Sequence, residues 1–312
     1  MRRIVFAIAL LLATQALPSG QVKTKPWTPP RTPDGHPDLQ GIWDYRSATP
    51  LQRPARFAGK EFLTSDEVVA YEQEALERPD GRPPDDARTE ESVHPVWWLD
   101  YGKTVVKTRR TSLIIDPPDG RIPPLTPKAQ KRNAARRAEA ATHGPADSYE
   151  NRSLFERCLT RGVPEGLLPG PYNNNLQILQ APGYVVLVTE MIHDARIVPM
   201  DGRPRSAAMG RWMGDPRGHW IGDTLVVDTV NFSDKVSFRG ATEKLHLVER
   251  FTRLDVDTLE YRFTVDDPDT FYQPWKTYQE YGRTDEALAS EICAENNLQF
   301  DYHMPVAQKP DF

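Results

Sequence analysis

The sequence predicts a mainly β fold. The expected architecture is an eight-stranded antiparallel up-and-down barrel of the lipocalin and streptavidin type, or a strongly curved sheet, wrapped by a proline-rich N-terminal half with two to three helices. Residues 176–281 contain eight strand-like segments joined by turns, with no helical crossover between them. Of the 29 prolines, 18 precede residue 146. Because proline fixes φ and lacks an amide donor, that half cannot build long regular elements.

The first residues predict an export signal. Arg2 and Arg3 precede the apolar run IVFAIALLLA and the small-residue pattern TQA. The apolar run is shorter than the roughly 20 residues needed to span a bilayer, and a retained membrane anchor is the alternative interpretation. We therefore expect residues 1–20 to be a signal peptide. The mature protein is expected to be soluble, in the periplasm or outside the cell.

The composition is that of a soluble globular protein, and the barrel fold, not the composition, predicts a small-molecule partner. The chain is 38% hydrophobic and 27% charged, and its net charge of −5 includes no basic excess for binding nucleic acid or anionic lipid. We therefore expect no nucleic-acid partner and no membrane partner after removal of the signal. The oligomeric state is not indicated by the sequence.

The proline-rich half, residues 21–162, is expected to pack around residues 163–312 as one globular unit. One helix is predicted to begin after Thr64, which forms a T-x-x-E capping box with Glu67. A second is predicted after Thr126, with proline at its first position. A short third helix is expected in NRSLFERCLTRG, residues 151–162.

The eight expected strands alternate with turn signals such as Pro182-Gly183 and Gly222-Asp223. They are LQILQ (176–180), YVVLVTEM (184–191), ARIVPM (195–200), RGHWI (217–221), TLVVDTVN (224–231), HLVERFTR (246–253), TLEYRFTV (258–265) and PWKTYQEY (274–281).

Alternation along the strands predicts which side chains face the interior. In the seventh strand the apolar face consists of Leu259, Tyr261, Phe263 and Val265. The sixth strand is less clearly divided, but Glu249 shares a face with Leu247 and Phe251. If this face is inward, a carboxylate lies inside the barrel. Burying it unpaired would cost several kcal/mol, so it needs a partner or a raised pKa. It is either part of a ligand site or a structural salt bridge to a buried arginine.

The second strand has apolar residues on both faces, which predicts that it is covered on both sides. Charged residues follow at its end, where a barrel has its rim. We expect His193 to act as an acid or base near neutral pH, oriented by Glu190 or Asp194. These three residues are the candidate catalytic group.

Four residues before the first strand, Tyr172, Asn173, Asn174 and Asn175, offer donors and acceptors to a hydroxylated ligand. Asparagine runs are also common in turns, because asparagine tolerates left-handed backbone angles. The candidate ligand-binding set is completed by Arg196 and Glu249.

Antiparallel order suggests how these charges are distributed. The end of the second strand and the start of the sixth are expected at opposite rims if the strands have equal lengths. The partners of His193 are therefore expected to be local: Glu190, Asp194 and Arg196. Glu249 is expected to join them only if long strands bring it inward, and His246 and Arg250 are expected to be structural or to belong to the other rim.

Other chemistries are not favoured. Glu190-x-x-His193 and His246-x-x-Glu249 have the spacing of di-metal ligand pairs, but residues three apart share a face on helices and not on strands. We expect no metal and no cofactor. The chain has no G-x-S-x-G motif, no Gly-rich phosphate loop and no dinucleotide fingerprint.

The two cysteines, Cys158 and Cys293, predict one disulfide in an exported protein, with a pair of buried thiols as the alternative. A catalytic cysteine would need a neighbouring base, and the residues around Cys158, namely Glu156, Arg157 and Thr160, supply none.

Several motifs together resemble a widespread family of secreted bacterial proteins, over nearly the whole mature chain. They are TPDGHPDLQGIWDY, RTSLIIDPPDGRIPPLTPKAQ, ERCLTRGVPEG, YNNNLQILQAPGYVVLVTEMIHDARIVPMDGRP, WIGDTLVVDTVNF and LHLVERFTRLDVDTLEYRFTVDDPDTF. The resemblance implies export. It also supports pairing of Cys158 with Cys293, because EICAENN is similar to the family's cysteine motif near the carboxyl end. It implies no reaction.

Three classes of function follow. The first is an acid–base enzyme, a lyase, isomerase or hydrolase, acting at the barrel mouth on a neutral hydroxylated or aromatic substrate. The second is a non-catalytic ligand carrier with the same barrel. The third is a carbohydrate-binding module that docks polysaccharide through Trp97, Trp98 and Trp275. Catalysis requires titratable groups that converge in one pocket, whereas a carrier requires only an apolar lining and a few donors.

Overall fold

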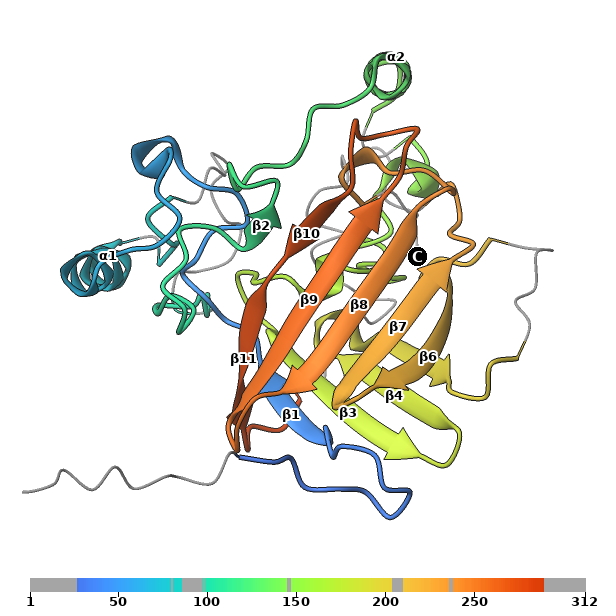
Figure 1. Ribbon diagram of the computed structural model, residues 1–312. Coiled ribbons are helices and arrows are strands. Elements are labelled where there is room, and N and C mark those ends of the chain that lie inside the picture. The colour runs from blue at the N-terminus through green and yellow to red at the C-terminus, as the bar shows by residue number, and fades with distance from the viewer. Residues whose placement is uncertain are drawn as a thin grey trace, which may run out of the picture.

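A computed structural model describes residues 27–79, 81–85, 97, 99–144, 147–203, 210–235 and 238–288, except for the side chain of residue 193. The fold is mainly β, as expected. Its centre is a nearly closed, barrel-like antiparallel sheet, and two α-helices lie outside that sheet (Figure 1).

The sheet contains eleven strands, and every described strand pair is antiparallel. The strands are β1 Gly41–Asp44, β2 Ile114–Asp116, β3 Asn175–Ala181, β4 Tyr184–Thr189, β5 Ala195–Pro199, β6 Asp215–Ile221, β7 Thr224–Val230, β8 His246–Arg253, β9 Thr258–Asp266, β10 Trp275–Thr277 and β11 Gln279–Thr284. Nine of them follow the order β5-β4-β3-β1-β11-β9-β8-β7-β6, while β10 pairs with β9 and β2.

The strands β3 to β9 lie where seven of the eight strands were expected, and the eighth is divided at Tyr278 into β10 and β11. The expected count misses β1 and β2, which both come from the proline-rich half; β1 lies between β3 and β11, and β2 pairs with β10. In β1, Trp43 pairs with Leu176 on one side and Arg283 on the other. A four-residue strand isolated among prolines has no detectable alternation, which explains why the sequence did not indicate it.

The barrel is nearly closed between its end strands, β5 and β6. No hydrogen-bonded pairing joins them, but the two strands are in contact. A Cβ atom added at Gly218 of β6 would lie only 2.9 Å from Cγ1 of Val198 in β5. Glycine at this position therefore permits the close approach of the two ends.

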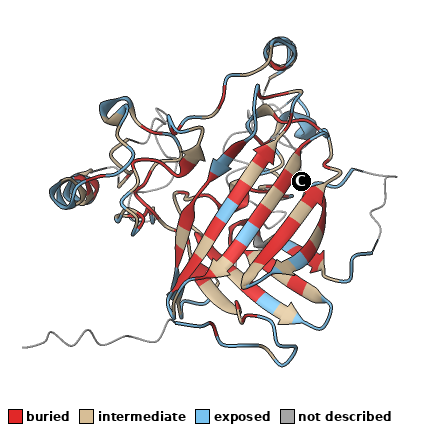
Figure 2. Ribbon diagram, in the orientation of Figure 1, coloured by how far each residue is buried: buried red, intermediate tan, exposed pale blue. Residues whose placement is uncertain are grey.

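The interior of the barrel is filled by the residues that alternation predicts. The inward side chains of β9 are at most 1% exposed, and Glu249 of β8 is fully buried, as predicted. Figure 2 shows the alternation of buried and less buried residues along β8 and β9. The rings of Tyr261 and Phe251 stack with centroids 4.8 Å apart, and Tyr281 lies 5.3 Å from Tyr261 on the other side.

The prediction that the second strand is covered on both faces is wrong. The inward residues of β4, such as Val185 and Leu187, are 2% exposed, but the outward residues Val186 and Val188 are only half-buried. Opposite Val186, the outward side chain of Ile197 in β5 is 60% exposed. β-Branched residues are enriched in strands because they fit a pleated, half-buried surface, so an apolar outer face does not by itself indicate that another layer covers it.

The two helices begin where the sequence indicates. In α1, Ser65–Glu77, the Glu67 amide donates to Thr64 Oγ1 at 3.3 Å and the Thr64 amide donates to Glu67 Oε2 at 2.7 Å. In α2, Pro127–Ala140, the Ala129 amide donates to Thr126 Oγ1 at 3.1 Å. Short 3₁₀ turns occupy Ala55–Phe57, Tyr149–Asn151, Glu165–Leu167, Met191–His193 and Phe238–Gly240.

The prediction of a third helix at residues 151–162 is wrong. A single turn forms after Ser153, whose Oγ accepts from the Glu156 amide at 3.1 Å. Cys158 then adopts φ of 53°, and the Leu159 amide bonds back to the Leu154 carbonyl at 2.8 Å. A left-handed residue at this position ends the helix after one turn.

The described part of the N-terminal half contributes β1 to the sheet, β2 beside β10, and both helices (Figure 1). Whether residues 21–162 and 163–312 form one folding unit remains a prediction. Within the described ranges, no helix is long and apolar enough to cross a membrane. The expected signal segment and Cys293 lie outside the described residues, and the Cys158 thiol is not free. The disulfide itself remains a prediction.

Candidate ligand site at the barrel mouth

The connection from β4 to β5 is a tight turn that gathers the charged residues at one rim. The Thr189 amide donates to the Asp194 carbonyl at 2.9 Å, which closes the turn. Within it, Ile192 adopts φ of 61°. The turn brings Glu190 and Asp194 to the same end of the barrel. The backbone of His193 belongs to the turn, but its side chain lies outside what the structure describes.

The Asp194 carboxylate holds a neighbouring segment against this rim. Its Oδ2 accepts from the Thr160 hydroxyl at 2.6 Å and from the Arg161 amide at 3.2 Å. The Thr160 hydroxyl also accepts from the Gly162 amide at 2.8 Å. Residues 160–162 are therefore fixed beside the start of β5.

Glu190 is bound to the first residue of β3. It is 5% exposed, its amide donates to the Asn175 carbonyl at 2.9 Å, and its Oε2 accepts from the Asn175 amide at 3.1 Å. Burial raises the pKa of nearby Tyr45; the Arg161 charge lowers this pKa and the Glu190 charge raises it. The Glu190 carboxylate is thus held inside the rim by backbone contacts.

The inward side chain of Arg196 crosses the barrel interior to Glu249. Nη1 lies 2.6 Å from Oε2 and Nη2 lies 2.9 Å from Oε1, which is a bidentate pair with both side chains at most 4% exposed. Tyr261 donates its hydroxyl to Oε1 of Glu249 at 2.8 Å. Burial lowers the pKa of Arg196, but the charge and hydrogen bonds of Glu249 outweigh burial and raise it. Burial and the Glu249 charge raise the pKa of Tyr261 well above its ordinary value.

This pair corrects the expected distribution of charges. The sequence predicts that Arg196 is a local partner of His193, whereas its guanidinium is held by Glu249, in the middle of β8. Of the two alternatives for Glu249, the structure shows the salt bridge to a buried arginine. The arginine side chain is long, and its acceptor Glu249 lies in the middle of β8. The pair can therefore form across the barrel interior, which the positions of the strand ends alone do not predict.

The asparagines before β3 make contacts that organise the chain. The Asn174 side chain accepts from the Gly170 amide at 2.7 Å and donates to the Gly170 carbonyl at 3.2 Å. Asn173 adopts φ of 54°, the left-handed conformation that asparagine tolerates. Tyr172 is half-buried. These contacts support the turn interpretation for Asn173 and Asn174.

A small pocket lies at this rim. Its lining combines two charged residues, one hydroxyl and apolar side chains: Gly162, Val163, Leu167, Leu187, Thr189, Asp194, Arg196 and Met213. The cavity has a volume of about 10 Å³, which is room for about one water molecule.

Two buried tyrosines support the pocket wall. Tyr45 donates its hydroxyl to the Gly166 carbonyl at 2.8 Å, and Tyr281 donates to the Leu167 carbonyl at 2.7 Å. Burial, together with the Tyr45 and Glu249 charges, raises the pKa of Tyr281 well above its ordinary value. Both hydroxyls therefore remain donors that fix the wall.

Some residues of the site could not be identified from the sequence. Alternation predicts that Tyr261 faces the interior, but nothing in the sequence indicates that Tyr281, Tyr45 or Thr160 would contact the rim. Met213 lies just before β6, outside any expected element. Contacts between segments this far apart in the chain leave no periodic signal.

Other candidate residues lie elsewhere. His246 Nε2 and Asp228 Oδ2 form a partly exposed pair at 2.8 Å. Trp275 is fully buried, so the prediction that it docks polysaccharide is wrong, while Trp97 is 82% exposed and Trp98 lies outside the described residues. In the described ranges, no three His, Cys, Asp or Glu side chains are grouped so that they could hold a metal ion.

Comparisons with models of known protein families, with curated proteins and with solved structures found no match.

Proposed function

We propose that the protein is an exported, lipocalin-like binding protein that holds a small organic molecule at the barrel mouth. The observation that carries this proposal is the pocket between Asp194 and Arg196, whose remaining wall is mainly apolar. An apolar wall with a few convergent polar groups is the usual composition of a small-molecule site. The proposal includes export and the wrapped, closed form of the barrel.

The pocket favours a neutral ligand over a charged one. The Arg196 charge is compensated by Glu249 at bidentate distance, so a ligand anion would meet a pair and not a free cation. A guanidinium has five N–H donors, and Glu249 accepts from two nitrogens. An acceptor such as a hydroxyl or carbonyl oxygen is therefore suited to the Arg196 side, and a donor is suited to Asp194.

The size of the pocket limits what enters it. Room for about one water fits a single hydroxyl or carbonyl group, while the rest of the ligand remains outside the rim. A neutral molecule with a hydroxyl or carbonyl group on a larger, for example aromatic, framework fits this description.

Acid–base catalysis at the same pocket is the second candidate. It is favoured by the Asp194 carboxylate, which lines the pocket beside His193 in the chain and is fixed by Thr160. His193 would act as the acid or base, and Glu190 or Asp194 would orient it.

Binding is tested with a library of neutral hydroxylated and aromatic compounds, by thermal shift and then calorimetry. Met213→Phe narrows the pocket and should abolish binding of any hit, whereas Leu254→Phe, at an exposed position, should not. Retained binding by Met213→Phe would place the ligand elsewhere and contradict the proposal.

Catalysis is tested on the same hits by following product formation with nuclear magnetic resonance. His193→Ala should abolish turnover, or binding in a carrier, while leaving the melting temperature nearly unchanged. His219→Ala, on an exposed position of β6, is the matched control. Loss of stability with function retained per folded molecule would identify His193 as a structural residue.

A further inference from the structure

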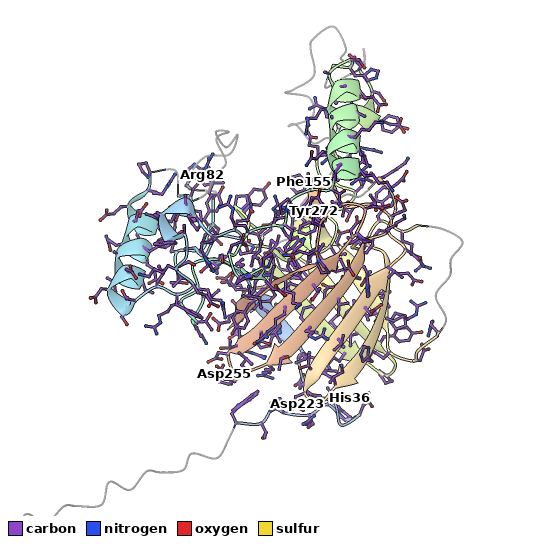
Figure 3. All side chains as sticks on the ribbon, turned by 45° about the horizontal axis from the view of Figure 1, so that its top comes forward. His36, Arg82, Phe155, Asp223, Asp255 and Tyr272 are labelled. Carbon is purple, nitrogen blue, oxygen red and sulfur yellow. The ribbon has the colours of Figure 1, made fainter. Side chains whose placement is uncertain are left out.

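Helix α2 is a cationic rod that extends from the body of the protein. It has five basic residues, Lys128, Lys131, Arg132, Arg136 and Arg137, and one acid, Glu139, in a chain whose net charge is −5. Only Ala129 of the helix is buried, and residues 134–143 are all exposed. Figure 3 shows the helix extending away from the sheet with side chains on its different sides.

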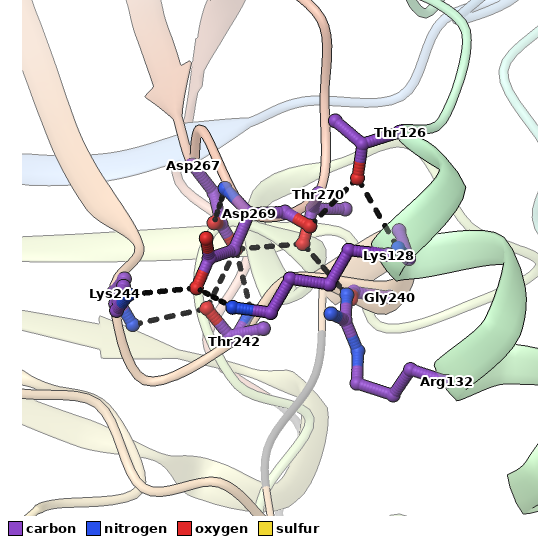
Figure 4. A network of polar contacts seen from close by, with 10 residues as sticks. Thr126, Lys128, Arg132, Gly240, Thr242, Lys244, Asp267, Asp269 and Thr270 are labelled. Atoms are coloured by element: carbon purple, nitrogen blue, oxygen red, sulfur yellow. Dashed lines mark hydrogen bonds and ion pairs between the residues drawn. The ribbon is translucent and has the colours of Figure 1, made fainter.

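The first turns of α2 are fixed to the body by two of these cations. Lys128 Nζ lies 2.7 Å from Asp269 Oδ2, and Arg132 Nη2 donates at 2.9 Å to both the Gly240 carbonyl and the Thr270 hydroxyl. Figure 4 shows these contacts in one network. The direction of the helix is therefore set at its N-terminal end.

The network behind this attachment is buried. Asp267, which is 1% exposed, accepts at 2.6 Å from the Thr242 amide and at 2.8 Å from the Thr270 hydroxyl (Figure 4). Its Oδ1 accepts from the Asp269 amide at 3.0 Å. The residues that hold Lys128 and Arg132 are thus themselves fixed.

The other three cations, Lys131, Arg136 and Arg137, have a different position. None of them makes an ion pair or side-chain hydrogen bond with the described residues. The helix also contains five alanines, the residue with the highest helix propensity. The free end of α2 is therefore suited to stay helical without packing and to present unpaired cations.

We propose that the free end of α2 binds an acidic segment of a partner protein. At about 100° per residue, Lys131, Arg136 and Arg137 lie about 140°, 100° and 120° apart around the helix. A flat bilayer meets one side of a rod and would engage only part of this set. α2 also carries no large apolar side chain to enter a membrane interface. An acidic segment that wraps around the helix can meet all three cations.

This inference concerns a site outside the barrel and does not depend on the ligand pocket. α2 has five basic residues and one acid, so it is locally cationic within a chain whose net charge is −5. Charge complementarity of this kind controls the choice of partner and the rate of association.

The test uses the whole protein and a fluorescein-labelled polyglutamate peptide, with binding followed by fluorescence anisotropy. The variant Lys131→Glu/Arg136→Glu/Arg137→Glu should weaken binding at least about tenfold. The neutral variant Lys131→Gln/Arg136→Gln/Arg137→Gln should give a smaller loss. Raising the ionic strength from about 0.05 M to about 0.5 M should weaken wild-type binding more than variant binding, because salt screens exposed charges.

The matched control replaces three exposed arginines of the barrel surface by glutamate, Arg250→Glu/Arg262→Glu/Arg283→Glu, which gives the same change in net charge. It should keep wild-type affinity. Circular dichroism checks that all variants retain the helix and the sheet. Equal loss in the control, or no binding of the peptide by the wild type, would overturn the proposal. The proposal would also be overturned if the wild type bound vesicles of equal parts phosphatidylcholine and phosphatidylglycerol but not the peptide, and if Lys131→Glu/Arg136→Glu/Arg137→Glu lost the vesicle binding.

Discussion

At the scale of single residues, the Arg196–Glu249 pair dominates the barrel interior. Two charges in an apolar core have lost their hydration, and among the described residues their mutual contact and the Tyr261 hydrogen bond compensate for that loss. The pair is therefore expected to be costly to break and less costly to replace as a whole.

We predict that Glu249→Gln and Arg196→Met each lower the free energy of unfolding by about 3–5 kcal/mol, because each leaves a buried partner unpaired. The double variant Arg196→Met/Glu249→Leu should be less destabilised than the sum of the two. Urea unfolding measures the free energy of unfolding of the single variants and of the double variant. The exposed pair of Arg31 and Asp223, 2.7 Å apart, is the control, since breaking it should cost less than about 1 kcal/mol. Additive effects of the core substitutions would show that the two residues do not interact.

The sequence indicated one half of this pair and misplaced the other. Glu249 was placed inside because its face also carries Leu247 and Phe251, and an apolar face identifies an interior. Arg196 follows Asp194 closely in the chain, so the sequence predicts that it lies at the rim beside His193. The partner of a buried charge is decided by which strands face each other across the barrel, and that depends on how the sheet closes.

At the scale of elements, local signals were sufficient wherever the contacts are local. The caps of α1 and α2 join residues three apart, and both helices begin where their capping residues lie. The helix expected at 151–162 does not form because Cys158 adopts a left-handed conformation, which the neighbouring residues do not predict.

The cap of α1 leads to a prediction on pH. The hydrogen bond from Lys60, with those of Thr64, lowers the pKa of Glu67 to about 2. A carboxyl whose pKa is depressed by folding contributes stability above its unfolded pKa of about 4.3, and this contribution is lost as the pH falls toward 2. Glu67→Gln should therefore be less stable than wild type at pH 6 and should approach it near pH 2. Thermal melts at the two pH values measure the difference, and a constant difference would contradict the assignment.

At the scale of the whole molecule, the two halves of the chain meet in the sheet. The sequence predicted the β half from alternation and turns, but the path from β3 to β11 passes through β1. Long-range pairing of a short strand has no signature in either half. The predicted disulfide would join the halves a second time, closing a loop of 135 residues and adding about 5 kcal/mol on the chain-entropy model.

The disulfide is tested by mass spectrometry of the mature protein without reduction. The mass should be lower by two hydrogens than that of the dithiol, and alkylation should not modify Cys158 or Cys293. Two alkylated thiols would exclude the bond. The same spectrum reports the first residue of the mature chain, expected between residues 17 and 24.

The insertion of β1 predicts that residues 163–312 do not fold alone. Without β1, the facing edges of β3 and β11 lose their hydrogen bonds, and the cavity left by the fully buried Trp43 opens the core between them. Trp43→Ala in the whole chain should by itself cost about 3–5 kcal/mol. We expect circular dichroism of the fragment to show no cooperative melt, and addition of a peptide covering residues 36–46 to restore part of it. A stable fragment beginning near residue 165 after limited proteolysis would instead show that the barrel closes without its N-terminal strand.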